Sequence, residues 1–308
     1  MKKGLVYRST GSWYTVKAEG VFYTCRIKGK FRLRGIKSTN PVAVGDHVIF
    51  EVDNQTKAPK GTIVEIEQRQ NYIVRKSVNL SKQTHIIASN IDQLFLLITL
   101  NNPPTFVAFI DRFLVTAEAY QIPSILVFNK LDTYSSEQKK EIDDLAAIYK
   151  KIGYRTLKIS ATEGHNINKI ESIMKNKVSV FSGHSGVGKS TLINHLAPDL
   201  NLKTASISDQ HQQGIHTTTF AEMFDLPNGM KLIDTPGIKG FGIVNMKANE
   251  VGNYFPEFKK LKPTCKFHNC LHQSEPGCAV ISAFDAGEVS ETRYKNYLQI
   301  LKKDTTYR

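Results

Sequence analysis

The feature that most restricts how this chain can fold is a phosphate-binding loop at residues 183–190. The loop reads Gly-His-Ser-Gly-Val-Gly-Lys-Ser and matches the pattern G-x-x-x-x-G-K-[ST]. An apolar stretch at 178–181 precedes it, and a stretch of helical character at 191–196 follows it. A strand, a glycine-rich loop and a helix in this order predict an α/β domain in which backbone N–H groups and a helix N-terminus hold phosphates.

Two further segments complete a predicted magnesium and γ-phosphate site. Lys189 is expected to reach the β- and γ-phosphates, and the Ser190 hydroxyl is expected to bind Mg²⁺. Residues 230–233 predict a short strand that ends in Asp-Thr-Pro-Gly at 234–237. A carboxylate at such a strand end holds Mg²⁺ through water, so Asp234 is the second predicted magnesium residue. The N–H of Gly237 is expected to meet the γ-phosphate.

A polar segment between these motifs reads Gly-Ile-His-Thr-Thr-Thr at 214–219. One threonine here is expected to complete the Mg²⁺ coordination and to sense the γ-phosphate. We assign this role to Thr218, with Thr217 and Thr219 as the alternatives. The alternative is an ordinary strand start rich in β-branched residues.

Guanine selectivity is predicted by Asn-Lys-Leu-Asp at 129–132, which follows a predicted strand at 122–128. The Asp132 carboxylate can accept N–H bonds from the guanine ring and from its exocyclic amine, which adenine does not offer. Two such bonds discriminate by about 3–6 kcal/mol. Ser160 and Ala161 follow a predicted strand at 156–159 and match the short motif that supports the guanine oxygen.

The motifs stand in an unusual order, because the base-reading motifs precede the phosphate loop. This order is a circular permutation of the ordinary GTPase order, and it is compatible with the same sheet because domain termini often lie close together. The predicted nucleotide-binding residues are Asn129, Lys130, Asp132, Ser160, Ala161, Gly183, His184, Ser185, Gly186, Val187, Gly188, Lys189, Ser190, Thr191, Asp234 and Gly237.

Hydrolysis needs a group that orients the attacking water, and the usual glutamine is missing. Ile238 follows the 234–237 motif, so slow intrinsic turnover is expected. His216 is the best replacement within the chain, with a purely structural histidine as the alternative. The predicted catalytic residues are therefore His216, Lys189 and Thr218.

Positive charge is concentrated near the N-terminus. The 308 residues carry 41 Lys+Arg against 28 Asp+Glu, and residues 1–70 hold 13 against 6 of these. Short predicted strands at 4–7, 13–18, 21–27, 31–33, 47–52 and 61–66 favour a small barrel of the OB-fold type. The predicted RNA-binding residues recur at every second position and are Arg26, Lys28, Lys30, Arg32 and Arg34. The alternative is an ordinary solvated strand face.

Three of the four cysteines and one histidine cluster near the C-terminus, as Cys265, Cys270, His272 and Cys278. A Cys₃His set predicts a closed tetrahedral zinc site, with His268 as a rival ligand. The lone Cys25 is expected to be a small buried apolar residue. Residues 285–303 predict a helix that begins near Asp285, with Tyr294, Leu298 and Leu301 on one stripe.

Together these motifs resemble the ribosome small subunit-dependent GTPase A family of bacteria, over essentially the whole chain. The resemblance implies an N-terminal OB-fold, a circularly permuted α/β GTPase domain and a C-terminal, mainly helical zinc domain. It implies late maturation of the small ribosomal subunit, binding to that subunit near the decoding region, GTP hydrolysis stimulated by the subunit, and binding of guanosine tetra- and pentaphosphate. His184 and Ile215 stand where this family often has Gln and Arg.

The predicted domains are an OB-fold RNA-binding domain at 1–70, a permuted GTPase domain at 71–239 and a zinc domain at 240–308. We expect one Zn²⁺ per chain, Mg²⁺ bound with GTP or GDP, and a monomer. We expect a cytoplasmic location and no membrane insertion, because no apolar run approaches the about 20 residues of a membrane helix. The alternatives are a GTP-dependent RNA-binding switch with negligible turnover and a DNA- or membrane-associated GTPase that uses the same basic barrel.

Overall fold

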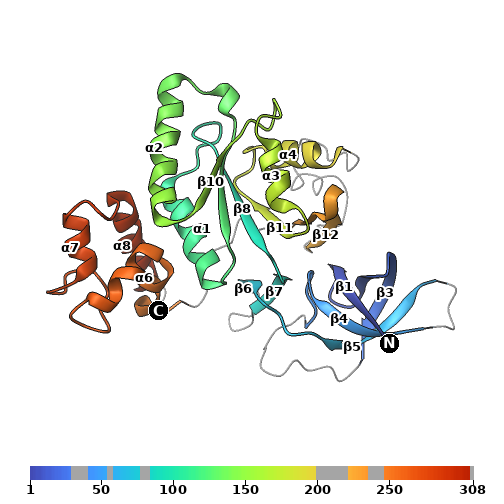
Figure 1. Ribbon diagram of the computed structural model, residues 1–308. Coiled ribbons are helices and arrows are strands. Elements are labelled where there is room, and N and C mark those ends of the chain that lie inside the picture. The colour runs from blue at the N-terminus through green and yellow to red at the C-terminus, as the bar shows by residue number, and fades with distance from the viewer. Residues whose placement is uncertain (29–40, 54–57, 77–83, 199–220, 235–245, 306–308) are drawn as a thin grey trace.

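The computed structural model describes residues 1–28, 41–53, 58–76, 84–198, 221–234 and 246–305. Within these ranges the chain forms a barrel, a central α/β layer structure and a helical C-terminal region (Figure 1). The other residues are not described, and several predictions fall on them. They are Lys30, Arg32, Arg34, His216, Thr217, Thr218, Thr219, Gly237, Ile238 and the strand at 31–33.

Five N-terminal strands close into a barrel. They are β1 (Lys2–Ser9), β2 (Tyr14–Ala18), β3 (Val21–Ile27), β4 (His47–Val52) and β5 (Lys60–Ile66). Neighbours pair in the order β1-β2-β3-β5-β4, and β4 returns to β1, with only the β3–β5 pair parallel. This closed five-stranded arrangement confirms the predicted OB-fold. The barrel interior contains Val6, Tyr14, Val16, Phe50 and also Cys25, whose thiol pKa burial raises to about 12.

The central sheet has the strand order β10-β9-β8-β11-β13-β12. These strands are β8 (Gln93–Ile98), β9 (Ser124–Phe128), β10 (Arg155–Lys158), β11 (Val178–Ser182), β12 (Glu222–Asp225) and β13 (Lys231–Asp234). All pairs are parallel except β12–β13. The expected strand at 122–128 starts two residues late, at Ser124, because Pro123 has no N–H to donate to a ladder.

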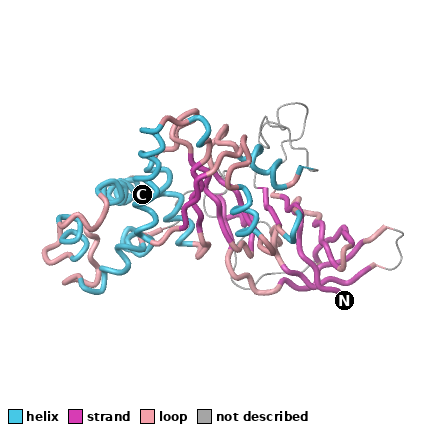
Figure 2. Tube along the Cα trace, turned by 45° about the horizontal axis from the view of Figure 1, so that its top comes forward, coloured by secondary structure: helices cyan, strands magenta, loops and turns pink. Residues whose placement is uncertain are grey.

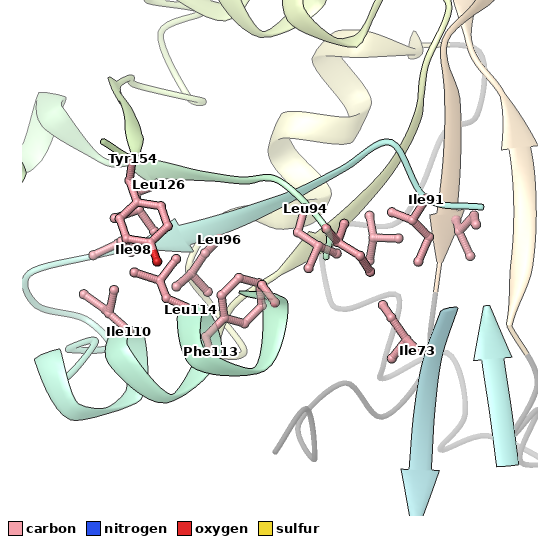
Figure 3. Packing of buried hydrophobic residues seen from close by; sticks show 14 of the residues in the cluster. Ile73, Ile91, Leu94, Leu96, Ile98, Ile110, Phe113, Leu114, Leu126 and Tyr154 are labelled. Atoms are coloured by element: carbon pink, nitrogen blue, oxygen red, sulfur yellow. The ribbon is translucent and has the colours of Figure 1, made fainter. Parts of the chain in front are cut away.

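Helices cover both faces of this sheet. The helices are α1 (Val107–Ala119), α2 (Ser136–Ile152), α3 (Ile167–Met174) and α4 (Lys189–Leu196), and α4 begins two residues earlier than expected. Helices α1 and α2 pack on one face, where Leu94, Leu96 and Ile98 of β8 meet Ile110 and Phe113 (Figure 3). Helices α3 and α4 pack on the other face. Burial on both faces explains why the parallel strands read as continuous apolar runs.

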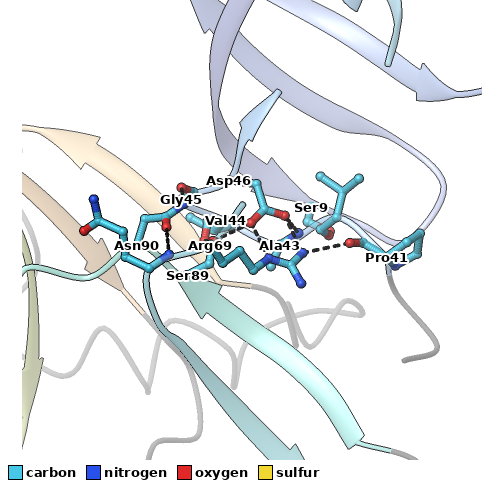
Figure 4. Close-up of polar contacts among 11 residues, drawn as sticks. Ser9, Pro41, Ala43, Val44, Gly45, Asp46, Arg69, Ser89 and Asn90 are labelled. Carbon is cyan, nitrogen blue, oxygen red and sulfur yellow. Dashed lines mark hydrogen bonds and ion pairs between the residues drawn. The ribbon is translucent and has the colours of Figure 1, made fainter. Parts of the chain in front are cut away.

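A buried ion pair joins the barrel to the central region. Asp46 is fully buried and accepts hydrogen bonds from Arg69 Nε and Nη2, both at 2.6 Å, and from the Ser89 hydroxyl at 2.6 Å (Figure 4). Ser89 ends β7 (Thr84–Ser89), which pairs with β6 (Tyr72–Lys76). A Cβ on Gly45 would lie 2.0 Å from the Ser89 carbonyl oxygen, so the two segments touch at backbone distance.

The barrel also continues directly into the central sheet, because β1 pairs with β12 at Arg8 and Glu222. In Figure 2 the barrel strands lie at the right and follow on from the strands of the central sheet, whereas the C-terminal helices lie at the left, beyond the central sheet. Tyr7 and Lys17 of the barrel donate to the Asp225 carboxylate of β12 at 2.6 and 2.5 Å. The barrel is therefore joined to the β6–β7 hairpin through Asp46 and Ser89, and to the central sheet through β1 and β12.

The C-terminal region contains α5 (Ala248–Val251), α6 (Pro256–Leu261), α7 (Ala279–Asp285) and α8 (Glu291–Thr305). Single 3₁₀ turns cover Leu131–Thr133, Pro227–Gly229, Gly252–Tyr254 and Lys262–Thr264. The prediction of a helix that begins near Asp285 is wrong, because Asp285 ends α7 and Gly287 then takes a left-handed conformation with φ +72°. Tyr294 and Leu301 are buried and Leu298 packs beside them, so the predicted stripe is confirmed.

A fully buried arginine fixes this region to the central helices. Arg293 of α8 donates at 2.8 Å to Asp111 of α1, and it forms a two-pronged pair with Glu257 of α6 at 2.8 and 2.9 Å. Asp111, also fully buried, accepts further bonds from Tyr149 and Asn296.

Among the described helices, none has both the length and the apolar character needed to cross a membrane.

Asp111→Ala should lower the free energy of unfolding by about 3–5 kcal/mol, because it removes one of the two carboxylates paired with the buried Arg293 and the acceptor of Tyr149 and Asn296. Glu291→Ala is the matched control on α8, since Glu291 and Lys295 form a solvent-exposed i,i+4 pair that contributes little to stability. Urea denaturation followed by circular dichroism measures both. Equal shifts in the two variants would contradict a structural role for the buried pair.

Candidate nucleotide-binding site and metal centre

The phosphate loop has a backbone shape that requires glycine at several positions. Gly183, Gly186 and Gly188 have φ values of +142°, +83° and +96°. A Cβ on Gly188 would lie 2.3 Å from the side-chain nitrogen of Asn129, and one on Gly183 would lie 2.7 Å from the Leu97 carbonyl oxygen. The pattern of glycines in the motif therefore has a steric cause in Leu97 of β8 and in Asn129, the residue that follows β9.

Lys189 closes this loop from inside. Its ammonium group donates to the carbonyl oxygens of Gly183 and His184 at 2.6 and 2.7 Å. Ser190 and Thr191 occupy the next positions in the first turn of α4, whose N-terminus favours anions. A phosphate group would offer the ammonium a charged acceptor in place of these two carbonyls.

The predicted magnesium residues come from adjacent elements. Asp234 ends β13, and β13 runs parallel to β11 with Ile233 opposite Val180, so both strands end at the same edge of the sheet. The phosphate loop follows β11 directly and places Ser190 at that edge. A hydroxyl and a carboxylate are the hard oxygen donors that Mg²⁺ prefers, so these residues suit the ion.

The amide of Asn129 connects the base-reading motifs to the phosphate loop. Its nitrogen donates to the Val187 carbonyl at 2.8 Å, and its oxygen accepts from the Ala161 N–H at 2.9 Å. The side chain is buried, so these two bonds have no competition from water. Three segments that are distant in the sequence therefore meet at one side chain.

The carboxylate predicted to read guanine is held in position and exposed. The Ser160 hydroxyl donates to Asp132 at 2.5 Å and accepts from the Glu163 N–H at 3.1 Å. Lys130 adopts a left-handed conformation with φ +67° and donates to the Asn102 carbonyl at 2.5 Å. The structure thus places Asn129, Lys130, Asp132, Ser160 and Ala161 together, as the motif reading requires.

Sequence reasoning missed the segment after β8 that borders this site. Pro103 lies 3.4 Å from the position of a Cβ on Gly186, and the ring of Phe109 lies 4.3 Å from the ring of His184. Burial and then the nearby Lys189 charge lower the pKa of His184 below its ordinary value. Nothing local marks these residues, because their contact with the loop depends on the packing of α1.

The four predicted metal ligands form one compact cluster. Ligand atoms of Cys265, Cys270, His272 and Cys278 all lie within 4.8 Å of one another, and this group could hold a metal ion. His272 presents its Nδ1 atom to the sulfur of Cys278 at 3.3 Å and to that of Cys265 at 3.7 Å. The rival ligand His268 is exposed and does not belong to the group.

Glu275 organises the loop that carries these ligands, and no sequence signal identified it. Its carboxylate accepts from the N–H groups of Leu271, Gln273 and Ser274 at 2.7, 2.8 and 3.1 Å. Partial burial favours the protonated form, but these backbone donors outweigh it and lower the pKa of Glu275 to about 2. The loop between His272 and Cys278 therefore has a fixed shape around an anion.

The described part of the predicted RNA face combines charge with exposed aromatic rings. In β3, Tyr23 and Cys25 are buried, whereas Arg26 is exposed together with the following Lys28. The guanidinium carbon of Arg26 lies 3.8 Å from the centre of the Trp13 ring, which is 39% exposed. This arrangement offers a flat cationic surface on the barrel.

Comparisons with known proteins agree with this architecture. A family model described as the RsgA GTPase matches residues 66–244, and one described as the RsgA N-terminal domain matches residues 3–59. The chain is 61% identical to the small ribosomal subunit biogenesis GTPase RsgA of Christiangramia forsetii, over 99% of this chain and 98% of that protein. It is 52% identical to the protein of the same name from Bacteroides fragilis, over 99% of both.

Two solved structures are also similar to this chain. One is YjeQ from Thermotoga maritima, at 32% identity and a TM-score of 0.81, with 100% of this chain and 99% of that chain covered. The other is YloQ, described as a circularly permuted GTPase, at 28% identity and a TM-score of 0.78, with 100% and 96% covered. The permuted motif order therefore has a counterpart in a known structure.

Asp132→Asn should weaken binding of guanosine diphosphate by about two to four decades, because it removes the charged acceptor for two guanine N–H groups. The same variant should bind xanthosine diphosphate better than the unchanged protein does, since xanthine carries a carbonyl where guanine carries an amine. Fluorescent nucleotide competition measures both affinities. Asp143→Asn on α2 is the control, and unchanged guanine preference in Asp132→Asn would refute the base-reading assignment.

Proposed function

The chain belongs to the RsgA GTPase family, and on that premise we propose that this GTPase acts in late maturation of the small (30S) ribosomal subunit. It binds rRNA of the subunit, hydrolyses GTP when the subunit stimulates it, and leaves in a nucleotide-dependent way. The observation that carries this proposal is the 61% identity over 99% of the chain to a small ribosomal subunit biogenesis GTPase.

Different residues of the nucleotide site bind the base, position the loops and stabilise the developing charge. Asp132 selects guanine, and Asn129 holds the base-reading loops against the phosphate loop. Lys189 exchanges its two carbonyl partners for the β- and γ-phosphates and stabilises the charge that develops on the γ-phosphate. A magnesium ion bound by Ser190 and Asp234 supplies further charge neutralisation.

We assign the orientation of the attacking water to His216, which lies outside the described residues. Ile238, in the position after the 234–237 motif, has no polar atom for this task. Thr218 is the assigned γ-phosphate sensor, with Thr217 and Thr219 as alternatives. Stimulation by the subunit follows if contact with rRNA orders His216 next to the water.

The proposed rRNA contacts lie at both ends of the molecule. On the barrel they include Arg26 over Trp13 and Lys28, with Lys30, Arg32 and Arg34 beyond the described part of the chain. Near the metal cluster, Phe267 is 40% exposed and Lys266 lies over its ring at 5.6 Å. No acidic residue occurs from 258 to 274, whereas four lysines do. Exposed rings beside cations suit base stacking in single-stranded rRNA.

We propose zinc as the metal of the Cys265, Cys270, His272 and Cys278 cluster. Three thiolates and one imidazole close a tetrahedral shell and leave no position for catalysis, so the ion has a structural role. Guanosine tetra- and pentaphosphate fit the same nucleotide site as GDP. We further propose that the protein is a cytoplasmic monomer and that its three domains meet at residues 70 and 239.

One observation favours a second candidate function. The missing glutamine at Ile238 suits a GTP-dependent RNA-binding switch with negligible turnover. A single assay separates this switch from an enzyme, because only the enzyme releases phosphate repeatedly in the presence of the subunit.

GTP hydrolysis should rise strongly when purified small subunits are added, and this stimulation should depend on His216. His216→Ala is expected to keep nucleotide affinity and to lose about 10²-fold or more of the stimulated kcat, because it removes the group that orients water. Phosphate release under multiple-turnover conditions measures the effect. His195→Ala, an exposed histidine in the last turn of α4, is the matched control.

Two results would contradict these proposals separately. Absence of stimulation in the unchanged protein, despite binding to the subunit, would favour the switch over the enzyme. Full stimulated turnover in His216→Ala would exclude the catalytic role of that residue and leave the enzyme assignment intact.

Purified protein should contain about one zinc ion per chain, and Cys270→Ser should lower this content strongly, because it removes a buried sulfur from a four-ligand shell. Atomic absorption measures the metal. Cys25→Ser and His268→Ala are controls that should retain the ion, since neither belongs to the cluster. Loss of zinc in His268→Ala, or full zinc in Cys270→Ser, would overturn the assigned ligand set.

A further inference from the structure

Three charged residues stand in one row across the junction of the barrel and the central sheet. Asp234 of β13 pairs with Glu222 of β12, and Glu222 pairs in turn with Arg8 of β1. Both pairs are antiparallel, so directly opposed side chains project to the same face of the sheet. The predicted magnesium carboxylate is therefore two strands away from an arginine of the barrel.

The packing of the neighbouring residues identifies this face. Met223 and Ile233 lie in the core under α1 and α2, together with Tyr7. Phe224 and Leu232 lie in the core under α3 and α4. Because side chains alternate along a strand, Arg8, Glu222 and Asp234 all project to the face of α3 and α4. Helix α4 is the helix that directly follows the phosphate loop, so this face is the face of the nucleotide site.

Local features hold Arg8 in this register. The ladder between β1 and β2 has an irregularity between Val6 and Arg8, after which pairing resumes with Arg8 opposite Thr15. Such bulges commonly redirect a side chain. On the opposite face, the bonds from Tyr7 and Lys17 to Asp225 lock β12 against the barrel. Arg8 therefore stays opposite Glu222.

The row consists of two carboxylates and one guanidinium. Two carboxylates, Glu222 and Asp234, are directly opposed, and like charges in that position are destabilising. Arg8 and Glu222 are each half-buried, and neither side chain has a hydrogen bond or ion pair with a described residue. Glu222 therefore lies between the guanidinium of Arg8 on β1 and the carboxylate of Asp234 on β13, where a bound Mg²⁺ would bring further positive charge.

We propose that Arg8 and Glu222 are positioning residues of the magnesium site, which tune its affinity for Mg²⁺ through their opposite charges. Glu222 adds negative potential beside Asp234 and strengthens Mg²⁺ binding. Arg8 partly neutralises Glu222 and repels the ion, so it weakens Mg²⁺ binding. The barrel thereby contributes a charged group to the nucleotide site. This inference rests on the proposed magnesium role of Asp234.

The expected effects have opposite signs. Glu222→Gln should weaken apparent Mg²⁺ affinity about three- to tenfold, because the ion loses a charge roughly 5–10 Å away. Arg8→Met, which keeps the apolar stem, should strengthen Mg²⁺ affinity about threefold. The double variant should return close to the unchanged protein. Both effects should shrink when the salt concentration rises from low to 0.5 M, because screening weakens exposed charges.

The experiment measures release of a fluorescent guanosine diphosphate as a function of Mg²⁺ concentration, with no hydrolysis involved. Arg8→Lys should behave like the unchanged protein, since it keeps the charge. Lys3→Met is the matched control on the same strand, because Lys3 is exposed and pairs with Glu67 instead. Thermal melting of each variant shows whether the β1–β12 junction stays intact.

The outcomes separate this inference from the proposed function. If Asp234→Asn leaves the Mg²⁺ dependence unchanged, the magnesium role of Asp234 is wrong. A second outcome is that Asp234→Asn abolishes the Mg²⁺ dependence, whereas Arg8→Met and Glu222→Gln are folded and show the same Mg²⁺ affinity as the control Lys3→Met. In that case the magnesium role of Asp234 holds and the inference about Arg8 and Glu222 is wrong. Changes of the same sign in the two variants would also overturn it.

Discussion

The side-chain amide of Asn129 is the interaction on which the nucleotide-binding edge depends. It accepts from the Ala161 N–H and donates to the Val187 carbonyl, and Gly188 leaves room for it. These bonds join segments whose order along the chain is permuted relative to ordinary GTPases. The amide requires only that three strand ends share one edge of a parallel sheet, and the strand order meets that requirement. The permutation therefore changes the connections and leaves the constellation intact.

Two buried ion pairs set the arrangement of the three parts around this edge. Asp46 with Arg69 holds the barrel side, and Asp111 with Arg293 holds the helical C-terminal side. Buried pairs add little net stability, because desolvation offsets their attraction. Their geometry is strict, however, since each carboxylate is satisfied by several donors from separate elements. Both contacts thus specify orientation more than they stabilise the fold.

Local signals were sufficient for the five described barrel strands, for β9, β10, β11 and β13 of the central sheet, for the phosphate loop and for the metal cluster, whereas β8 and β12 were not predicted. Each of these is encoded by period-two alternation, glycine spacing or ligand spacing within a short window. The junction of β1 with β12 was not predictable, because it joins positions 8 and 222 through one ladder contact. The burial of Arg293 was not predictable for the same reason, because its partner Asp111 lies 182 positions away in the chain. The late start of α8 depends on one glycine, Gly287, within an otherwise helical composition.

The location of the positive charge has a mechanical consequence. Residues 1–70 carry 13 Lys/Arg against 6 Asp/Glu, and their first strand is hydrogen-bonded to β12. In the sequence, β12 lies between the threonine-rich segment at 214–219 and the carboxylate Asp234. A polyanion bound to the barrel is therefore connected to the strand that lies between two predicted γ-phosphate elements. Strand β12 pairs with β13 on one side and is hydrogen-bonded to the barrel through Asp225, so it contacts both parts at once. In the proposed function, the rRNA-binding barrel is thus joined to the nucleotide-binding edge through a strand only four residues long.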